Sequence, residues 1–241
     1  MTGLAQLRAG VVSAALIGVA VSAPADTPVW REDFRLIPEG WEVRGKPGTD
    51  ETRFSVPDST LPDGGLLELE ADDSSATLLT KLDSIDLRTA PILRWRWRVT
   101  RLPPGADGRN KDRDDQAIAI YVTDGGRFRQ HSIAYRWETE TPVGTAGWAK
   151  YMGGFVQVRW FCLRNRADAE RGTFFTEERN VADDFRAAYG FIPKKPVIGI
   201  ASNSQYTGSK AAAQLDWIEL MPRVPVLAPA HGSSTDGASA E

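Results

Sequence analysis

The segment LRWRWRV, residues 93–99, constrains its own backbone more tightly than any other stretch of the sequence. Apolar and charged residues alternate strictly along it, and successive side chains of a β-strand point to opposite faces of a sheet. One face therefore carries two tryptophans, and the other carries Arg94, Arg96 and Arg98. The tryptophan face predicts a buried side, whereas the arginine face must meet water, carboxylates or a ligand.

Other short runs repeat this pattern between clusters of Gly, Pro, Asn and Asp, which is typical of an all-β sandwich or barrel. Further predicted strands cover residues 66–71, 117–122, 132–137, 156–162, 197–202 and 213–220. One short helix is predicted over residues 180–190, because Asn180 and Asp183 match a capping pattern and Gly190 can end the helix. Two segments, 102–115 and 140–154, are predicted to be long loops.

The two ends of the chain differ from the middle in composition. An apolar run over residues 9–21 follows Arg8, and Ala23-Pro24-Ala25 fits a signal-peptidase pattern. We therefore predict a signal peptide over residues 1–25, periplasmic or secreted localisation, and no stable membrane span after cleavage; an uncleaved anchor is the alternative. Residues 223–241 are rich in Pro, Ala and Ser and are predicted to be a disordered tail, which leaves one β-sandwich domain over 26–222.

Composition excludes several classes of function. Cys162 is the only cysteine, so the chain can form no intramolecular disulfide. The alternation places Cys162 beside Trp160 on the core side of its strand, where we expect it to be buried and unreactive. The net charge of −3 provides no overall field that would attract nucleic acid. His131 and His231 are too few for a histidine-rich zinc site.

Three blocks, residues 93–122, 177–190 and 197–220, together resemble a bacterial exported family known as domain of unknown function 3047. The resemblance extends over roughly residues 30–220. It implies a jelly-roll-like, antiparallel β-sandwich of the kind found in carbohydrate-binding modules, and it implies no established activity. Where the family has an acidic stretch similar to TDTDNTG, this chain has SNSQYTG at 202–208, so roles tied to those aspartates do not carry over.

A ligand-binding face is predicted if the strands over residues 93–99, 132–137 and 156–162 share one sheet with the same face inward. Guanidinium groups match carboxylates, sulfates and phosphates, and aromatic rings can stack on sugars. Trp148, in the Gly-rich loop, is the preferred stacking residue. The predicted ligand is a polar or acidic glycan or another polyanion; the alternative is that the arginines pair with carboxylates of neighbouring strands. The candidate ligand-binding residues are Arg94, Arg96, Arg98, Asp114, Asp115, Tyr121, Arg136, Trp148 and Arg159.

Two groups of carboxylates are further candidates. Asp112, Asp114 and Asp115 could serve acid–base chemistry or hold a hard cation, or they could pair with arginines or cap a turn. Similarity to carbohydrate modules at both chain ends implies a structural Ca²⁺ site. Its candidate ligands are Glu32, Asp33 and Asp216. Calcium prefers six to eight oxygens, so backbone and water would have to complete the site; a turn with an exposed aspartate is the alternative.

These features favour an exported glycan-binding module. A polysaccharide lyase on the same scaffold is one alternative, with a cation that neutralises a uronate and a Tyr or His that moves protons. A cell-envelope protein-interaction module is another. The residues available for lyase chemistry are Arg96, Arg136, Arg159, Tyr121, Tyr135 and His131.

Overall fold

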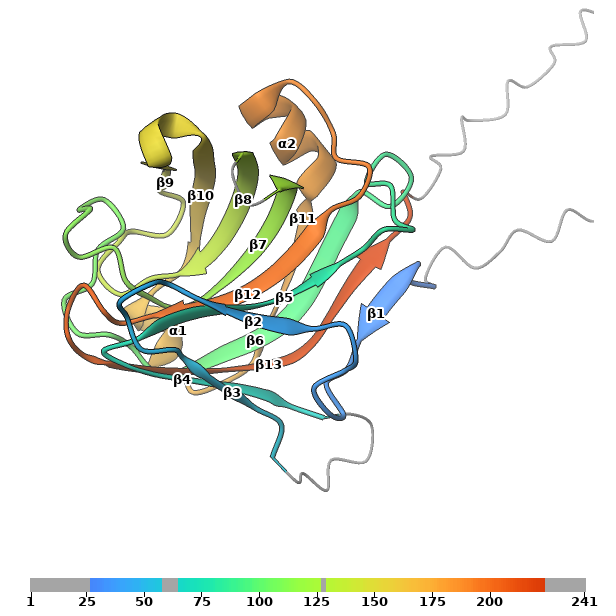
Figure 1. The fold of residues 1–241 in the computed structure, drawn as a ribbon. Helices are drawn as coiled ribbons and strands as arrows, with labels where there is room; N and C mark the ends of the chain where they lie inside the picture. The colour runs from blue at the N-terminus through green and yellow to red at the C-terminus, as the bar shows by residue number, and fades with distance from the viewer. Residues whose placement is uncertain (1–26, 58–64, 127–128, 224–241) are drawn as a thin grey trace, which may run out of the picture.

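The alternating segments assemble into two β-sheets packed face to face, in a computed structural model that describes residues 27–57, 65–126 and 129–223 (Figure 1). The predicted all-β sandwich is confirmed. The predicted signal peptide and residues 224–241 of the predicted tail lie outside the described residues. Within the described ranges, no helix is both long and apolar enough to cross a membrane.

The first sheet has six strands in the order β11-β6-β13-β4-β3, and β1 pairs with the C-terminal half of β13. All of its pairs are antiparallel. Its strands are β1 (Trp30–Glu32), β3 (Arg53–Ser55), β4 (Leu67–Asp72), β6 (Ile92–Arg101), β11 (Phe175–Asn180) and β13 (Lys210–Met221).

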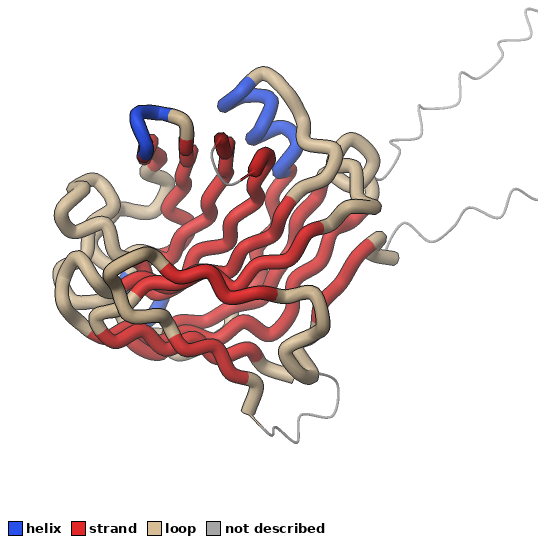
Figure 2. The backbone as a smooth tube through the Cα atoms, in the orientation of Figure 1, coloured by secondary structure: helices blue, strands red, loops and turns tan. Residues whose placement is uncertain are grey.

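The second sheet has seven strands in the order β2-β5-β12-β7-β8-β10-β9. Its strands are β2 (Glu42–Gly45), β5 (Ser75–Lys81), β7 (Gln116–Gly126), β8 (Arg129–Trp137), β9 (Ala146–Tyr151), β10 (Val156–Arg164) and β12 (Val197–Asn203). One pair departs from the predicted antiparallel arrangement, because β8 and β10 run parallel. Strands dominate the fold in Figure 2, and the helical segments are α1 (Arg166–Ala169), α2 (Val181–Tyr189) and the 3₁₀ turn η1 (Met152–Gly154).

The core between the sheets contains the tryptophan face predicted for residues 93–99. Trp95 stacks on Tyr135 of β8 with ring centroids 5.2 Å apart, and Trp97 meets Trp137 edge-on at 5.5 Å. All four rings are fully buried. Burial of these aromatic rings, together with aliphatic side chains from both sheets, stabilises the sandwich.

Two predictions from the alternation are wrong. The predicted loop over 140–154 contains β9, which pairs with β10 at the edge of the sheet and has no buried residue, so it needs no apolar alternation. In addition, Trp160 and Cys162 lie on the outer face of the seven-stranded sheet in a separate small cluster, whereas Phe161 packs against the main core. Strand β10 is apolar on both faces, and alternation alone cannot identify the core side of such a strand.

Helix α2 lies where the sequence predicts it. Its N-cap residue Asn180 accepts a hydrogen bond from the Asp183 amide at 3.1 Å, and Gly190 ends it with φ of 79°. Phe185 is fully buried in the main core. Tyr189 bridges the parallel pair β8 and β10: its hydroxyl lies 2.8 Å from the Ser132 carbonyl, 3.0 Å from the Gln157 carbonyl and 3.2 Å from the Arg159 amide.

The variant Tyr189→Phe is expected to lower the free energy of unfolding by about 1–3 kcal/mol, because it removes a hydroxyl that satisfies partly buried backbone groups. Urea denaturation followed by circular dichroism measures this loss. Tyr206→Phe is the control, since that ring is 37% exposed. An equal effect of both variants would contradict the bridging role.

Candidate functional site

The predicted arginine face does not form, because its strands belong to different sheets. Strand β6 lies in the six-stranded sheet, whereas β8 and β10 lie in the seven-stranded sheet. Arg136 and Arg159 also point to opposite faces: the Arg136 guanidinium lies 5.1 Å from the ring of Trp160 on the outer face, whereas Arg159 lies over Phe161 on the core side. The guanidinium groups are therefore not gathered on one surface.

Arg94, Arg96 and Arg98 lie on the outer face of the six-stranded sheet, where β13 supplies most of their partners. Arg96 pairs with Asp216 at 2.5 Å, and Arg98 donates from Nε to Gln214 Oε1 at 2.5 Å. Arg94 lies 3.3 Å from Glu219 of β13 and 3.5 Å from Glu178 of β11. These contacts match the ion-pair alternative of the sequence analysis.

Arg136 is 1% exposed, and its environment is a buried network of charges. Its Nη1 donates to Asp114 Oδ1 at 2.6 Å and lies 3.5 Å from Glu138 Oε1. Burial raises the pKa of the Asp114 carboxyl group and of the Glu138 carboxyl group above their ordinary values, and the Arg136 guanidinium opposes both shifts. Burial acts to lower the pKa of Arg136, but Tyr121 and the two carboxylates raise it, so the guanidinium stays charged.

Asp115, next along the chain, serves a different structural purpose. Its fully buried carboxylate accepts hydrogen bonds from the Tyr206 amide at 3.1 Å and from the Thr207 amide and hydroxyl, both at 2.7 Å. It thereby fixes the segment 202–208, which carries no aspartates. Asp112 remains exposed in the loop that precedes it. Asp114 thus pairs with an arginine and Asp115 caps a turn, as the alternative in the sequence analysis states.

The carboxylates predicted to bind calcium have other contacts. Asp216 pairs with Arg96, Asp33 lies 2.6 Å from Arg31, and Glu32 accepts a hydrogen bond from the Phe34 amide at 2.9 Å. Among the residues that the structure describes, no group of three or more His, Cys, Asp or Glu side chains is placed to hold a metal ion. Calcium binding stays a prediction from the sequence.

A cleft of about 460 Å³ is hollowed into the outer face of the seven-stranded sheet. The strand register explains its composition, because one row across five strands contains Lys81, Val197, Thr123, Ser132 and Val158. The neighbouring row contains Leu79, Gly199 and Tyr121. The other lining residues are Arg44, Thr77, Gly125, Gly126, Gln130, Tyr151 and Val156.

The charges at this cleft have one sign. Arg44 and Lys81 lie on the β2–β5 side, and within the described ranges no carboxylate lines the cleft. Arg44 pairs with Glu42, which lies outside the lining, at 2.7 Å, and this exposed pair reduces the net field of Arg44. Lys81 makes no ion pair with the described residues, so it is the cation that gives the cleft its sign of charge. Burial raises the pKa of the Tyr121 phenol, with Arg136 opposing, so that hydroxyl stays protonated at neutral pH and can donate a hydrogen bond.

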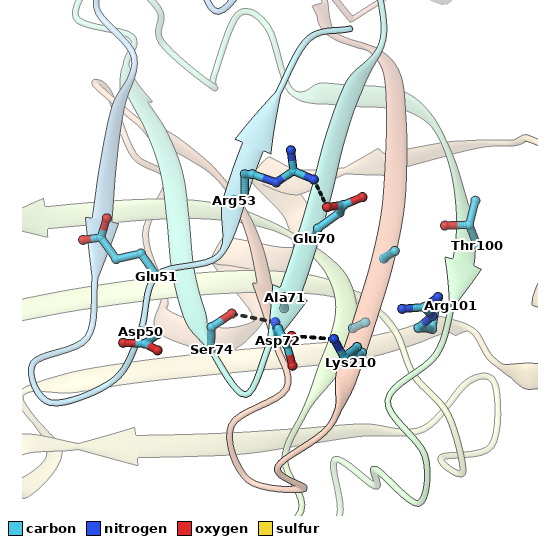
Figure 3. A pocket seen from close by; sticks show the side chains of 12 residues that line it. Asp50, Glu51, Arg53, Glu70, Ala71, Asp72, Ser74, Thr100, Arg101 and Lys210 are labelled. Atoms are coloured by element: carbon cyan, nitrogen blue, oxygen red, sulfur yellow. Dashed lines mark hydrogen bonds and ion pairs between the residues drawn. The ribbon is translucent and has the colours of Figure 1, made fainter.

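A second hollow of about 740 Å³ lies on the outer face of the six-stranded sheet (Figure 3). Although it is larger, its charged walls largely neutralise each other. Arg53 points toward Glu70, and Lys210 lies 2.6 Å from Asp72 (Figure 3). Exposed pairs of this kind leave little net field for a ligand. We therefore take the cleft of the seven-stranded sheet as the candidate functional site.

Of the predicted ligand-binding residues, only Tyr121 lines this cleft, and Arg136 and Asp114 are buried near it. Trp148 of β9 packs on Tyr189 at 5.5 Å on the inner side, so it is not the stacking residue of the cleft. The lyase residues are likewise scattered, since Tyr135 is in the core and His131 packs on Tyr189. Cys162 is buried as predicted, and burial raises its pKa to about 12.

Sequence reasoning missed most of the cleft. Arg44, Lys81 and Tyr151 lie in strands that were not predicted. Alternation puts Thr123 on the same outer face as Tyr121, and Ser132 lies opposite Thr123 on the neighbouring strand. This pattern could have identified both residues once β7 and β8 were known to be neighbours. The missing information was the order of strands in the sheet.

A family model described as protein of unknown function (DUF3047) matches residues 39–219. Comparison with curated proteins finds no match. Among solved structures, a family 11 carbohydrate-binding module of a Clostridium thermocellum cellulosomal cellulase shares 10% identity at a TM-score of 0.42, over 82% of this chain and 97% of that one. Endoglucanase cel12A from Rhodothermus marinus shares 9% identity at a TM-score of 0.43, over 80% of this chain and 96% of that one. Similarities this low assign neither a ligand nor an activity to this chain.

Proposed function

The chain belongs to the family described as protein of unknown function (DUF3047), and we propose that it binds an acidic saccharide in the cleft of its seven-stranded sheet. The observation that carries the proposal is the single sign of charge at the cleft: Arg44 and Lys81 line it without a carboxylate among the described residues. A lining of this kind attracts carboxylate or sulfate groups and repels cations.

Polar groups suited to sugar hydroxyls lie along the middle of the cleft. Thr123 and Ser132 are 2.8 Å apart through their hydroxyl oxygens. Ser132 is only 3% exposed, so the half-buried Thr123 presents the hydroxyl of this pair, which has hydrogen-bonding capacity beyond that bond. Gln130 adds an amide, and Tyr121 adds a protonated phenol. A few placed polar groups on an apolar surface are the usual composition of a small-molecule site.

Tyr151 provides a flat apolar surface at the β9 side of the cleft. It is 44% exposed, so part of its surface is open to solvent. A tyrosine ring offers an apolar face and a polar edge, a combination suited to the apolar face of a sugar ring. We propose that it takes the stacking role that the sequence analysis gave to Trp148. The sequence at residues 1–25 supports a periplasmic or secreted setting for this binding.

The double variant Arg44→Gln, Lys81→Gln tests the proposal. Galacturonate and mannuronate tetrasaccharides are titrated by calorimetry, with maltotetraose as the neutral counterpart. A charge-assisted hydrogen bond contributes enough for about tenfold in affinity, so the variant is expected to weaken uronate binding at least tenfold. Added salt is expected to weaken it as well.

The matched control is Arg53→Gln, Lys210→Gln, which makes the same change of charge at the hollow of the six-stranded sheet. The control should bind uronates as the unmodified protein does. Equal affinity for uronates and maltotetraose, or an equal loss in both double variants, would overturn the proposed function.

A further inference from the structure

The cleft changes in character from one side to the other. The row that begins with Lys81 on β5 passes through the hydroxyls of Thr123 and Ser132 and ends at Val158 on β10. Four inter-strand steps separate Lys81 from Val158, or about 19 Å at the usual strand spacing. The cleft is thus cationic at the β2–β5 side, hydroxylated in the middle and apolar at the β10 side.

The apolar side is lined by Val156 and Val158, with Tyr151 beside them. Aliphatic side chains form no hydrogen bonds, so sugar hydroxyls placed against them would lose their water without a partner, which is unfavourable. Val156 and Val158 therefore suit a part of the ligand that carries no hydroxyl groups, whereas Tyr151 beside them can stack on the apolar face of the adjoining sugar ring.

Two exposed apolar residues lie in the β9–β10 connection, next in the chain to this side of the cleft. Met152 is 58% exposed and Phe155 is 63% exposed, and they lie between the cleft-lining Tyr151 and Val156 in the chain. Single exposed apolar residues are common on protein surfaces. Because cleft-lining residues flank these two in the chain, the β9–β10 connection is the nearest apolar segment for a chain that leaves this side of the cleft.

Resting on the proposed function, we infer that the natural ligand is an acidic saccharide that carries an apolar chain. The carboxylate or sulfate lies toward Arg44 and Lys81, and the sugar hydroxyls meet Thr123. The chain leaves the cleft over Val156 and Val158 toward the β9–β10 connection. The chemical class is an acidic glycolipid or an alkyl glycoside of a uronic acid.

Four probes separate this inference from the proposed function: octyl and methyl β-D-glucuronide, and octyl and methyl β-D-glucoside. All are titrated below the concentrations at which the octyl compounds form micelles. Each buried methylene group raises an affinity by about fourfold, so burial of about two or three predicts roughly 15- to 60-fold tighter binding of octyl than of methyl glucuronide. The glucuronides are expected to bind about tenfold more tightly than the matching glucosides.

The variant Met152→Asn, Phe155→Asn should lower the affinity for octyl glucuronide toward that for methyl glucuronide and leave methyl glucuronide unaffected. The control Leu36→Asn, Val143→Asn replaces residues of similar exposure, 63% and 54%, away from the cleft lining and should change neither.

Equal binding of octyl and methyl glucuronide overturns the inference while the charge dependence keeps the proposed function. Equal binding of glucuronides and glucosides overturns the proposed function itself. If the exposed pair instead mediates self-association, the variant dissociates oligomers without changing the octyl preference, and the inference fails.

Discussion

Replacing Arg136 with methionine is expected to lower the free energy of unfolding by about 3–5 kcal/mol, because it leaves two buried carboxyl groups without their cation. Asp114 is 8% exposed and Glu138 is fully buried. Methionine keeps much of the apolar volume that packs on Trp160, so the loss reports the charge rather than a cavity. Urea denaturation followed by circular dichroism measures it.

Two further variants show whether charge causes the loss. Arg159→Met removes a half-buried arginine on the opposite face of the same sheet and should cost much less. The triple variant Arg136→Met, Asp114→Asn, Glu138→Gln removes the uncompensated charges and should recover part of the stability. A stable Arg136→Met protein that has lost uronate binding would restore Arg136 to the ligand-binding role predicted from the sequence.

The faces of β6 and β8 could be predicted because each strand is apolar on one side only. Trp95 and Trp97 of β6, and Tyr135 and Trp137 of β8, are fully buried as their alternation indicates. Strand β10 could not be predicted in the same way, since Phe161 on one face and Trp160 on the other are both apolar. The packing of β10 against its neighbours determines which of the two rings faces the core.

The partners of the arginines could not be predicted because alternation says nothing about which strands are neighbours. Strand β6 lies between β11 and β13, so Arg94 and Arg96 meet Glu219 and Asp216 of a strand more than a hundred positions later in the sequence. The same lack of information hid the cleft. Its lining combines residues from β2, β5, β7, β8, β9, β10 and β12 that only the sheet order brings together.

Gly199 is the position at which a single side chain would remove the proposed site. It lies on β12 in the row between Leu79 and Tyr121, and the space above it is part of the cleft. An added Cβ would approach the Thr77 methyl group to 2.9 Å and the Tyr121 Cβ to 3.4 Å. The nearest atom is a side-chain methyl group rather than backbone, and the backbone of Gly199 is not in the left-handed region, so an added side chain requires a shift of Thr77 but no change of backbone conformation.

The variant Gly199→Leu is therefore expected to reduce uronate binding by more than about a hundredfold, because removing two or more contacts of about tenfold each multiplies their effects. The free energy of unfolding should fall by about 1–3 kcal/mol, the usual range for overpacking at one site. Calorimetry with galacturonate tetrasaccharide and thermal unfolding measure the two quantities. Ala212→Leu, which fills the hollow on the other sheet, should leave binding intact. A folded Gly199→Leu protein with undiminished uronate affinity would place the ligand elsewhere on the molecule.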